Sequence, residues 1–361
     1  MEDVLFNSFF KGKRVLVTGH TGFKGAWLAL WLAQLGAKVT GYSLKPPTEP
    51  SMFEALGLEK HIEHVEGDVR DGRRLKEVFD KSSPQIAFHM AAQPLVLDSY
   101  DDPVGTIATN VMGTVNFLEA CRKTPSLKSV VCITSDKCYE NRENRRAFVE
   151  TDPLGGRDPY SASKACAEIA VSAYRNSFFS KQGSAAVAST RAGNVIGGGD
   201  WAKNRLVCDC ARFLSASKKI QVRRPNATRA WQHVLEPLSG YMLLSRRLYE
   251  QGKAFEGGWN FGPSSDATVE TVVRKIIALW KSGSYAVAAG QDAHEAGFLN
   301  LDSSKARREL GWKACLDLDE SLSMTVEWYK AFYCKEKQDA LFGLSVAQIS
   351  RYSAKAKAAW K

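Results

Sequence analysis

Short apolar runs rich in β-branched residues alternate with longer segments in which apolar residues recur at helical spacing. Such runs suit the strands of a parallel sheet that is covered on both faces. From Ala26 to Leu35 the apolar positions follow one helical face, and Gly36 follows as a C-cap. Strands that alternate with helices predict an α/β fold with a doubly wound parallel sheet. The runs predicted as strands are 14–18, 39–42, one that ends at 67–69, 85–90, 130–133 and 186–191.

A glycine-rich turn, Gly19-His20-Thr21-Gly22-Phe23-Lys24-Gly25, joins the first predicted strand to the helix after it. Gly19 allows a tight turn, Gly22 lets the backbone approach a pyrophosphate, and Gly25 lets the helix pack close to the strand. The helix N-terminus supplies free N–H donors. This strand, turn and helix predict a Rossmann-like dinucleotide site. The predicted cofactor contacts of the turn are Gly19, Thr21, Gly22, Phe23, Lys24 and Gly25.

The residues expected to contact the rest of a dinucleotide do not decide between NAD and NADP as the cofactor. No acidic residue ends the second predicted strand; Ser43 can bond a ribose hydroxyl, and Lys45 can equally meet a 2′-phosphate, so NAD and NADP both fit. Asp68 is placed to meet the adenine amino group, and a helix cap is the alternative reading of this residue. The other predicted cofactor contacts are Val69, Ala91, Ala92, Gln93, Asn110, Thr134, Tyr160 and Lys164.

Two polar clusters carry the candidate chemistry. Ser135, Asp136 and Lys137 place a hydroxyl, a carboxylate and an amine at the carboxyl end of a strand, where open α/β sheets bind ligands. Tyr160 and Lys164 lie one helical turn apart on the same face. An acid, a base and a phenol near one pocket indicate proton and hydride chemistry. The alternatives are an ordinary helix face and a surface ion pair, which alternation along a strand disfavours.

From about residue 200 the expected elements become shorter, which indicates a smaller C-terminal substrate-binding cap. We therefore expect a dinucleotide-binding Rossmann domain at 1–192 and, at 193–361, mainly the cap, with segments that return to the first domain. Three successive glycines at 197–199 indicate backbone packed against a ligand, or a plain turn. Arginines can fork onto phosphates, and aromatic rings can stack on a base. The predicted substrate contacts are Gln93, Ser135, Asn194, Trp201, Arg205, Arg229, Trp231 and His294.

Composition narrows the class of protein. The 361 residues are 44% hydrophobic and 24% charged, as in a globular protein, and the formal net charge is +10. The basic residues come as scattered pairs, so we expect a phosphate-binding cleft and no nucleic-acid partner. The eight cysteines form no CxxC pair, which indicates reduced thiols in a cytoplasmic protein and no metal site. No signal peptide or long apolar segment is recognised, so we expect no membrane association.

These motifs together resemble the extended short-chain dehydrogenase/reductase superfamily. The resemblance rests on the glycine turn, the Tyr160/Lys164 spacing and three further motifs. The further motifs are Gly67-Asp68-Val69, Arg191-x-x-Asn194, and Ser304-Lys305-Ala306 followed by Leu310-Gly311-Trp312.

Within that superfamily the chain resembles the CDP-glucose 4,6-dehydratases in the glycine turn and in residues 134–139, 191–201 and 231–241. It departs from them at Leu97-Asp98, where they carry an arginine, and at Ala230, where they carry a proline. The resemblance implies NAD as cofactor, a nucleotide-sugar substrate such as CDP-glucose, and a homodimer or homotetramer. Other readings are a dehydratase for a GDP- or dTDP-sugar, a nucleotide-sugar 4-epimerase, and an NAD-binding regulatory protein.

The resemblance also implies catalytic roles. Tyr160 acts as the base at the sugar 4-hydroxyl, with its pKa lowered by Lys164, and Ser135 bonds the same hydroxyl. NAD accepts the C4 hydride, Lys137 removes the C5 proton, and protonated Asp136 protonates the departing C6 hydroxyl. Return of the hydride to C6 then yields a 4-keto-6-deoxy sugar nucleotide.

Overall fold

The computed structural model describes residues 3–142, 146–263, 266–288 and 299–360. Its centre is a seven-stranded sheet in the order β11-β6-β5-β4-β1-β2-β3, and every pair of neighbouring strands is parallel. The order reverses between β1 and β4, so this is the doubly wound parallel sheet that the sequence predicts. The strands are β1 (Arg14–Thr18), β2 (Lys38–Ser43), β3 (Glu63–Glu66), β4 (Ile86–His89), β5 (Ser129–Ile133), β6 (Ala186–Ala192) and β11 (Gly257–Phe261).

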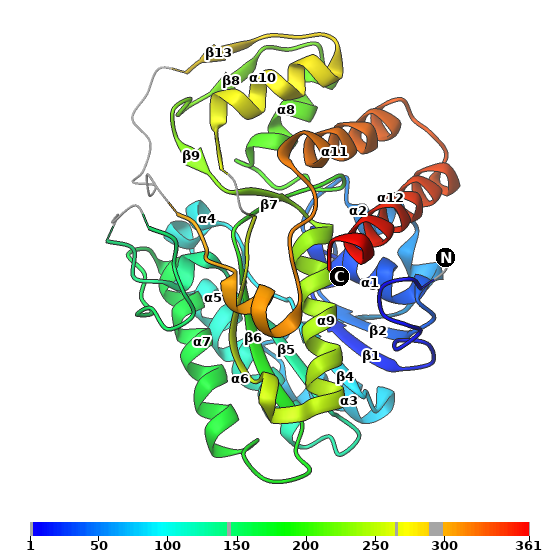
Figure 1. Cartoon of the computed structure of the whole chain (residues 1–361), viewed down its shortest axis with the longest axis vertical. Helices are drawn as coiled ribbons and strands as arrows, with labels where there is room; N and C mark the ends of the chain where they lie inside the picture. Colours follow the sequence, from blue (N-terminus) through cyan, green and yellow to red (C-terminus); the bar gives the residue numbers. More distant parts are fainter. Residues whose placement is uncertain (1–2, 143–145, 264–265, 289–298, 361) are drawn as a thin grey trace.

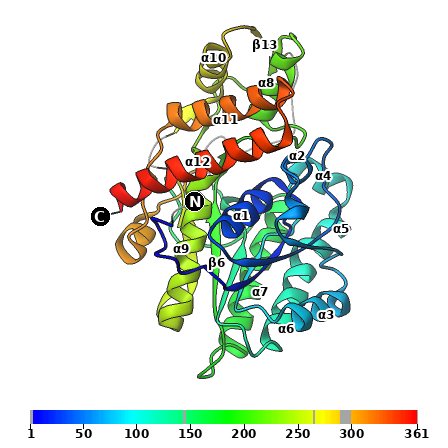
Figure 2. The same cartoon turned by 90° about the vertical axis from the view of Figure 1, so that its right-hand side faces the viewer.

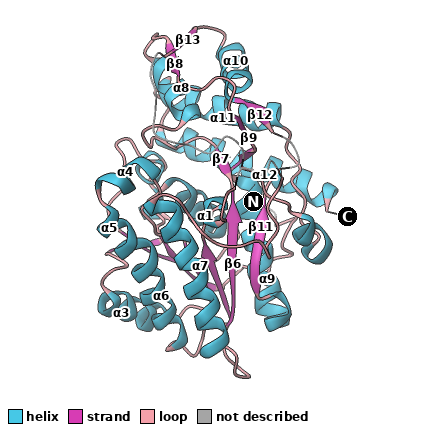
Figure 3. Ribbon diagram, turned by 90° about the vertical axis from the view of Figure 1, so that its left-hand side faces the viewer, coloured by secondary structure: helices cyan, strands magenta, loops and turns pink. Residues whose placement is uncertain are grey.

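Helices cover both faces of the sheet (Figures 1 and 2). On one face, Trp27 and Trp31 of α1 are fully buried in an apolar core shared with α9 and α12. On the other face, α3, α6 and α7 enclose a second core around Phe79 and Phe117 (Figure 3). The helices of these layers are α1 (Phe23–Gln34), α3 (Gly72–Ser82), α6 (Gly113–Arg122), α7 (Pro159–Ser177), α9 (Leu235–Gln251) and α12 (Gln338–Ala359).

A smaller region lies beyond the carboxyl ends of the strands, at the top of Figure 1. It has its own apolar core, built around residues such as Leu214, Val272 and Val326. Its short strands pair in twos: β7 (Asn194–Ile196) with β10 (Trp231–His233), β8 (Ile220–Val222) with β13 (Tyr285–Val287), and β9 (Thr228–Arg229) with β12 (Ala267–Thr268). Its helices are α8 (Leu206–Ser215), α10 (Val269–Trp280) and α11 (Leu318–Tyr333).

Shorter helical segments connect these layers. Between β4 and α6 the chain forms α4 (Val96–Asp101), α5 (Pro103–Ile107) and the π-helical segment η2 (Ala108–Met112). The segment η2 runs on into α6 without a break. The remaining segments are α2 (Met52–Ala55), η1 (Leu58–Lys60), η3 (Asp136–Cys138), η4 (Gly252–Phe255) and η5 (Ala306–Leu310).

The register of the sheet brings several strand ends to one edge. Thr18 of β1 lies opposite both Tyr42 of β2 and His89 of β4, and Cys132 of β5 lies opposite His89 and Ser189. The loops that follow these strands therefore leave the sheet side by side, directly below the smaller region. The third strand ends at Glu66, just before residues 67–69, which were predicted to form its end. Among the described residues, no helix combines the length and apolar character needed to cross a membrane.

Candidate active site

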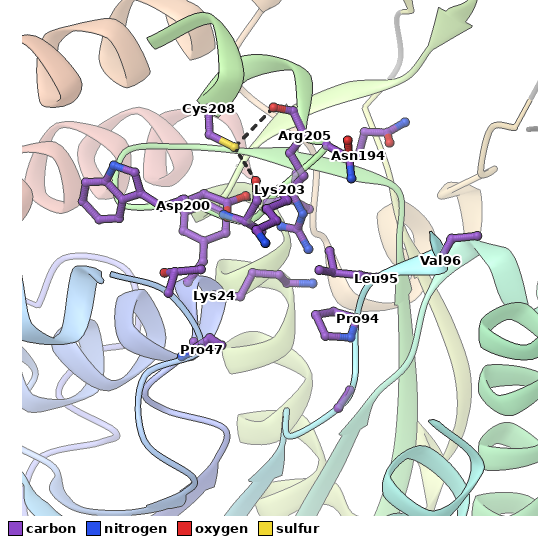
Figure 4. A pocket seen from close by; sticks show the side chains of 18 of the residues that line it. Lys24, Pro47, Pro94, Leu95, Val96, Asn194, Asp200, Lys203, Arg205 and Cys208 are labelled. Atoms are coloured by element: carbon purple, nitrogen blue, oxygen red, sulfur yellow. Dashed lines mark hydrogen bonds and ion pairs between the residues drawn. The ribbon is translucent and has the colours of Figure 1, made fainter. Parts of the chain in front are cut away.

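A cavity of about 720 Å³ lies between the carboxyl edge of the sheet and the smaller region. Its floor is the glycine turn after β1 and the loops after β2, β4, β5 and β6, and its roof comes from residues 194–231. Figure 4 shows the part where Lys24 faces residues of the roof. Fourteen of the sixteen predicted cofactor contacts line this cavity: Gly19, Thr21, Gly22, Phe23, Lys24, Gly25, Ser43, Asp68, Val69, Ala91, Ala92, Thr134, Tyr160 and Lys164.

The three glycines of the turn meet different surroundings. Gly19 has a φ of +76°, and a Cβ added there would lie 2.6 Å from the Ala91 backbone nitrogen. A Cβ on Gly25 would lie 2.1 Å from the carbonyl oxygen of Gly19, so the helix can pack here only without a side chain. A Cβ on Gly22 would meet only that same oxygen, at 3.5 Å. The protein itself therefore requires glycine at 19 and 25, while Gly22 keeps space open on the cavity side.

The two remaining predicted cofactor contacts, Gln93 and Asn110, are not among the residues that line the cavity. The Gln93 amide donates to Leu95 O at 3.0 Å and to Thr106 Oγ1 at 2.9 Å. Asn110 accepts the backbone N–H of Gln93 at 2.8 Å and donates to Ser163 Oγ at 2.8 Å. Gln93 thus ties the loop after β4 to α5, and Asn110 ties it to α7.

Three of the predicted cofactor contacts have side-chain partners within the protein. The Thr21 and Ser43 hydroxyls share a hydrogen bond of 2.8 Å. The Asp68 carboxylate pairs with Arg70 at 2.6 Å. The alternative reading of Asp68 as a helix cap is wrong, because Asp71 caps α3 by accepting the backbone N–H of Arg74.

Ser135, Asp136 and Lys137 leave β5 in a tight turn, with η3 starting at Asp136. The argument against an ion pair between Asp136 and Lys137 assumed that these residues continue the strand, and that assumption is wrong. Ser135 Oγ accepts the backbone N–H of Lys137 at 3.2 Å and donates to Asp136 Oδ1 at 2.9 Å. Asp136 is buried, and burial raises the pKa of its carboxyl despite the opposing charges of Lys137 and Lys24. This carboxyl is suited to hold a proton.

Tyr160 and Lys164 lie in the first turns of α7, which Asp158 caps by accepting the backbone N–H of Ser161 at 2.9 Å. Burial raises the pKa of Tyr160 to about 12, and a hydrogen bond with Ser135 lowers it only in part. The expectation that Lys164 gives this phenol a lowered pKa is therefore wrong. Burial lowers the pKa of Lys164 itself to about 8.

A buried ion pair supports this part of the site from below. Arg191 of β6 donates to Glu168 of α7 at 2.7 Å, and both side chains are almost fully buried. Glu168 also accepts the hydroxyls of Thr134, at 2.5 Å, and of Ser189, at 2.7 Å. Burial alone would raise the pKa of Glu168, but Arg191 and these hydroxyls hold it below its usual value. Thr134, which precedes the turn at Ser135 to Lys137, is thereby tied to α7.

Lys24 lies closer to the centre of the cavity than its place in the glycine turn predicts. Its Nζ donates to Tyr241 Oη at 3.3 Å and reaches into the middle of the cavity (Figure 4). Burial, followed by the positive charges of Lys164 and Arg205, lowers the pKa of Lys24 to about 7, against the opposing charge of Asp136. Only its position near the helix N-terminus is visible in the sequence, and that position does not reveal these neighbours.

The roof contains the predicted substrate contacts Asn194, Trp201, Arg205, Arg229 and Trp231, all of which line the cavity together with Ser135. Arg205 pairs with Asp200 at 2.7 Å, a partner that sequence reasoning did not assign. The Trp201 ring is buried among Trp328, Tyr329 and Phe332, so much of it serves packing. Gln93 does not line the cavity, and His294 lies outside the described residues.

Comparison with known proteins adds independent findings. Residues 16–325 match the family model described as GDP-mannose 4,6 dehydratase. The chain is 50% identical over 332 residues to a CDP-glucose 4,6-dehydratase of Salmonella typhimurium, covering 90% of this chain and 92% of that protein. It is 26% identical over 336 residues to a dTDP-glucose 4,6-dehydratase of Xanthomonas campestris, covering 87% and 92%. The fold matches the structure of a dTDP-glucose 4,6-dehydratase from Bacillus anthracis in complex with NAD, with a TM-score of 0.74, 24% identity, and coverage of 91% of this chain and 99% of that one.

Proposed function

This chain belongs to the GDP-mannose 4,6 dehydratase family, and from that premise we propose that it is an NAD-dependent CDP-glucose 4,6-dehydratase. The observation that carries the proposal is the 50% identity to a CDP-glucose 4,6-dehydratase along nearly the whole of both chains. The identity to the dTDP-glucose enzyme is only 26%, which favours the cytidine nucleotide. The product is CDP-4-keto-6-deoxyglucose.

The residues present fit NAD. Gly22 leaves space open in the turn between β1 and α1, and the first N–H groups of α1 are donors for a pyrophosphate. Tyr160 and Lys164 line the same cavity and would serve the hydride transfer between the substrate and the nicotinamide. When bound, NAD supplies the acceptor for the C4 hydride and the donor that returns this hydride to C6.

The side chains supply the proton chemistry and orientation. Tyr160 takes the proton from the sugar 4-hydroxyl, and Ser135 holds that hydroxyl in place. Once C4 is a ketone, the C5 proton is acidic enough for the Lys137 amine to remove it. Asp136, whose burial favours its protonated form, gives a proton to the departing C6 hydroxyl. Lys137 then returns its proton to C5.

The roof provides the substrate phosphate site in this proposal. Arg205 and Arg229 line the cavity and can bind the diphosphate, while Asp200 holds the Arg205 side chain in position. Leu97 and Asp98, where related enzymes carry an arginine, also line the cavity. The division at residue 192 fits this arrangement: we propose a cofactor-binding part at 1–192 and mainly a substrate-binding cap at 193–361, with β11 returning to the sheet.

We also propose a homodimer, or a tetramer built from it. The neighbouring segments α4, α5, η2 and α7 expose large apolar side chains, and Val104 is 78% exposed. Exposed apolar side chains on neighbouring helices are typical of a helix–helix interface. The cytoplasm is the proposed location, which the eight free thiols of the described chain support. The exposed apolar side chains are Val104, Ile107, Met112 and Ile169, together with Leu97 and Tyr100 of α4, which also line the cavity.

The direct test is to incubate the protein with NAD and CDP-glucose and to identify the product by mass spectrometry and by the alkaline absorbance of a 4-keto sugar. We expect loss of one water and no net NADH. GDP- and dTDP-glucose serve as competing substrates, and Tyr160→Phe serves as the inactive control. A product of unchanged mass would indicate an epimerase, and NAD binding without turnover of any of these sugars would indicate a regulatory protein.

A further inference from the structure

We propose that His89 is a positioning residue that holds the backbone beneath the cofactor in register with α7, the helix that carries Tyr160. His89 is the last residue of β4 and does not line the cavity, whereas Ala91, two residues later, does. Its ring is buried, at 2% exposure, and both ring nitrogens have hydrogen-bond partners. The inference rests on the proposed function, because the step that His89 affects is the hydride transfer.

The hydrogen bonds around His89 run in one direction. Thr18 Oγ1 accepts the backbone N–H groups of Met90, at 3.1 Å, and of Ala91, at 3.2 Å. A hydroxyl oxygen has two lone pairs, so the Thr18 proton is left to point at His89 Nδ1, which lies 2.9 Å away. His89 therefore accepts at Nδ1 and carries its own proton on Nε2. That proton points at Thr114 Oγ1, at a distance of 3.1 Å between the heavy atoms.

Thr114 extends the network to α7. Its hydroxyl donates to the carbonyl oxygen of Asn110 at 2.7 Å, which leaves the Thr114 oxygen free to accept the histidine proton. The side-chain amide of Asn110 donates to Ser163 Oγ at 2.8 Å, and Ser163 donates to the carbonyl oxygen of Tyr160 at 2.7 Å. Asn110 lies in η2, and π-helical segments often occur at functional sites. Hydrogen bonds therefore connect the backbone of Ala91 with that of Tyr160.

The surroundings keep the His89 ring neutral, as this arrangement requires. Burial, followed by the positive charge of Lys164, lowers the pKa of His89 to about 3. The ring stacks on Phe117, with the ring centroids 4.6 Å apart. A second proton, on Nδ1, would face a Thr18 oxygen that already accepts two N–H groups. The packing and the hydrogen bonds thus select one neutral tautomer.

The network matters for hydride transfer because it joins two walls of one cavity. Ala91 and Ala92 line the cavity from the loop after β4, and Tyr160 lines it from α7. A displacement of either wall changes the distance between C4 of the sugar and the nicotinamide in the proposed function. Misplacement by about 1 Å can cost ~10²-fold in rate, even when the altered residue is remote from the chemistry. His89 would therefore act on the rate through its neighbours.

The test breaks the network at Thr114, which does not line the cavity. Thr114→Val replaces the hydroxyl by a methyl group and removes the acceptor for His89 Nε2, while Thr114→Ser keeps the hydroxyl. Each holoenzyme is mixed with CDP-glucose in stopped flow, and NADH absorbance is followed over a single turnover. We expect Thr114→Val to form NADH about 10- to 100-fold more slowly with KM for CDP-glucose close to that of the parent, and Thr114→Ser to recover most of the rate.

A kinetic isotope effect separates positioning from a loss of stability. Deuterium at C4 of CDP-glucose should slow NADH formation by Thr114→Val markedly, because hydride transfer is then the slow step. A variant that is only less stable would contain less active enzyme but keep the parent rate constant. Ser245→Ala is the matched control, because it removes a buried hydrogen bond of 3.1 Å to Ser129 at the amino end of β5. It should form NADH at the parent rate.

The direction of the hydrogen bonds is tested without turnover. NMR of nitrogen-labelled histidine in the NAD-loaded parent should show His89 with a proton on Nε2 and none on Nδ1. The signal of His89 is assigned by its loss in His89→Phe, which keeps an aromatic ring against Phe117. In Thr114→Val the Nε2 proton signal should shift, because it loses its acceptor. A proton on Nδ1 of the parent would contradict the network.

NADH formation by Thr114→Val at the parent rate, or equal slowing in Thr114→Ser, would overturn the positioning role. So would a slowed Thr114→Val enzyme that shows no isotope effect. The parent in the same assay tests the proposed function separately. If the parent yields the 4-keto-6-deoxy product while Thr114→Val matches it, only the positioning role is wrong. If the parent yields neither NADH nor that product, the proposed function falls and the positioning role with it. Circular dichroism and NAD titration confirm that each variant is folded and loaded.

Discussion

Alanine at two glycines of the same turn should separate the stability of the protein from its binding of NAD. At Gly25 an added Cβ would lie 2.1 Å from the carbonyl oxygen of Gly19 and 2.8 Å from His20 Cα. Both contacts are with backbone atoms, so no side chain can rotate away, and either α1 or the turn must move. At Gly22 an added Cβ has one ordinary contact, at 3.5 Å. The backbone at Gly22, with φ −79° and ψ 165°, is one that alanine adopts easily.

The magnitudes follow from these contacts. Overpacking inside a protein costs roughly 1–3 kcal/mol or more, and a rigid overlap of this size belongs at about 3 kcal/mol. With about 2 °C per kcal/mol for a chain of this length, Gly25→Ala should lower Tm by roughly 6 °C. Gly22→Ala should stay within about 0.5 kcal/mol of the parent. Its methyl group lies where the backbone should approach the pyrophosphate, so NAD affinity should fall by about tenfold, or about 1.4 kcal/mol.

Thermal unfolding followed by circular dichroism measures the first effect, and calorimetric titration with NAD measures the second. Each variant serves as the control for the other, because both add one methyl group to the same turn. A Gly25→Ala protein with the parent Tm would refute the packing argument. A Gly22→Ala or Gly22→Val protein with unchanged NAD affinity would refute the assignment of the turn to the cofactor.

Three further predictions test the rest of the site. Arg205→Met and Arg229→Met should each raise KM for CDP-glucose about tenfold or more, because a charge-assisted hydrogen bond contributes ~1.5–3 kcal/mol. Arg274→Met, which removes an exposed ion pair on α10, is the control. An unaltered KM in the Arg205 or Arg229 variant would remove that arginine from the site. Tyr160→Phe should form no NADH in a single turnover, and normal NADH formation would exclude Tyr160 as the group that accepts the O4 proton. Lys24→Met should raise Tm by a few degrees, roughly 1 kcal/mol or more, at pH 7. The pKa of Lys24 in the folded protein, about 7, lies below its unfolded value of 10.5, so the parent gains stability as pH rises between these values. The advantage of the variant should therefore disappear above pH 10.5. A constant difference in Tm across this range would contradict the lowered pKa.

The local pattern was sufficient to predict the glycine turn and six of the seven strands of the sheet, whereas β11 was not predicted. The strand predicted at 14–18 is β1 with the same ends, because its apolar run is bounded by the turn itself. Gly36 follows α1 with a φ of +79°, as a C-terminal glycine should. These features depend on neighbours within a few residues, which the sequence shows directly. The stacking of strand ends that creates the cavity follows from the same parallel topology.

Features that depend on distant contacts were not predictable in this way. Asp71 rather than Asp68 caps α3 because β3 ends earlier than expected and Arg70 engages the Asp68 carboxylate. The Gln93 amide points into its own loop, toward Thr106, which the spacing along the chain does not reveal. The direction of the Tyr160 pKa shift depends on how deeply α7 is buried, and the pair at Tyr160 and Lys164 indicated the opposite direction.

The charges of the cavity explain why a protein would keep groups that weaken its own fold. Lys24 and Lys164 are held where burial lowers their pKa values, to about 7 and about 8, and Lys24 is further opposed by the nearby charges of Lys164 and Arg205. Asp200 pairs with Arg205, but the acidic residues near the two lysines do not restore their ordinary pKa values. In the proposed function two diphosphates enter this cavity, one from NAD and one from the nucleotide sugar, and each provides a negatively charged partner for the lysines. Binding then relieves a repulsion already present in the protein, so part of the affinity comes from a destabilised cavity rather than from new contacts alone.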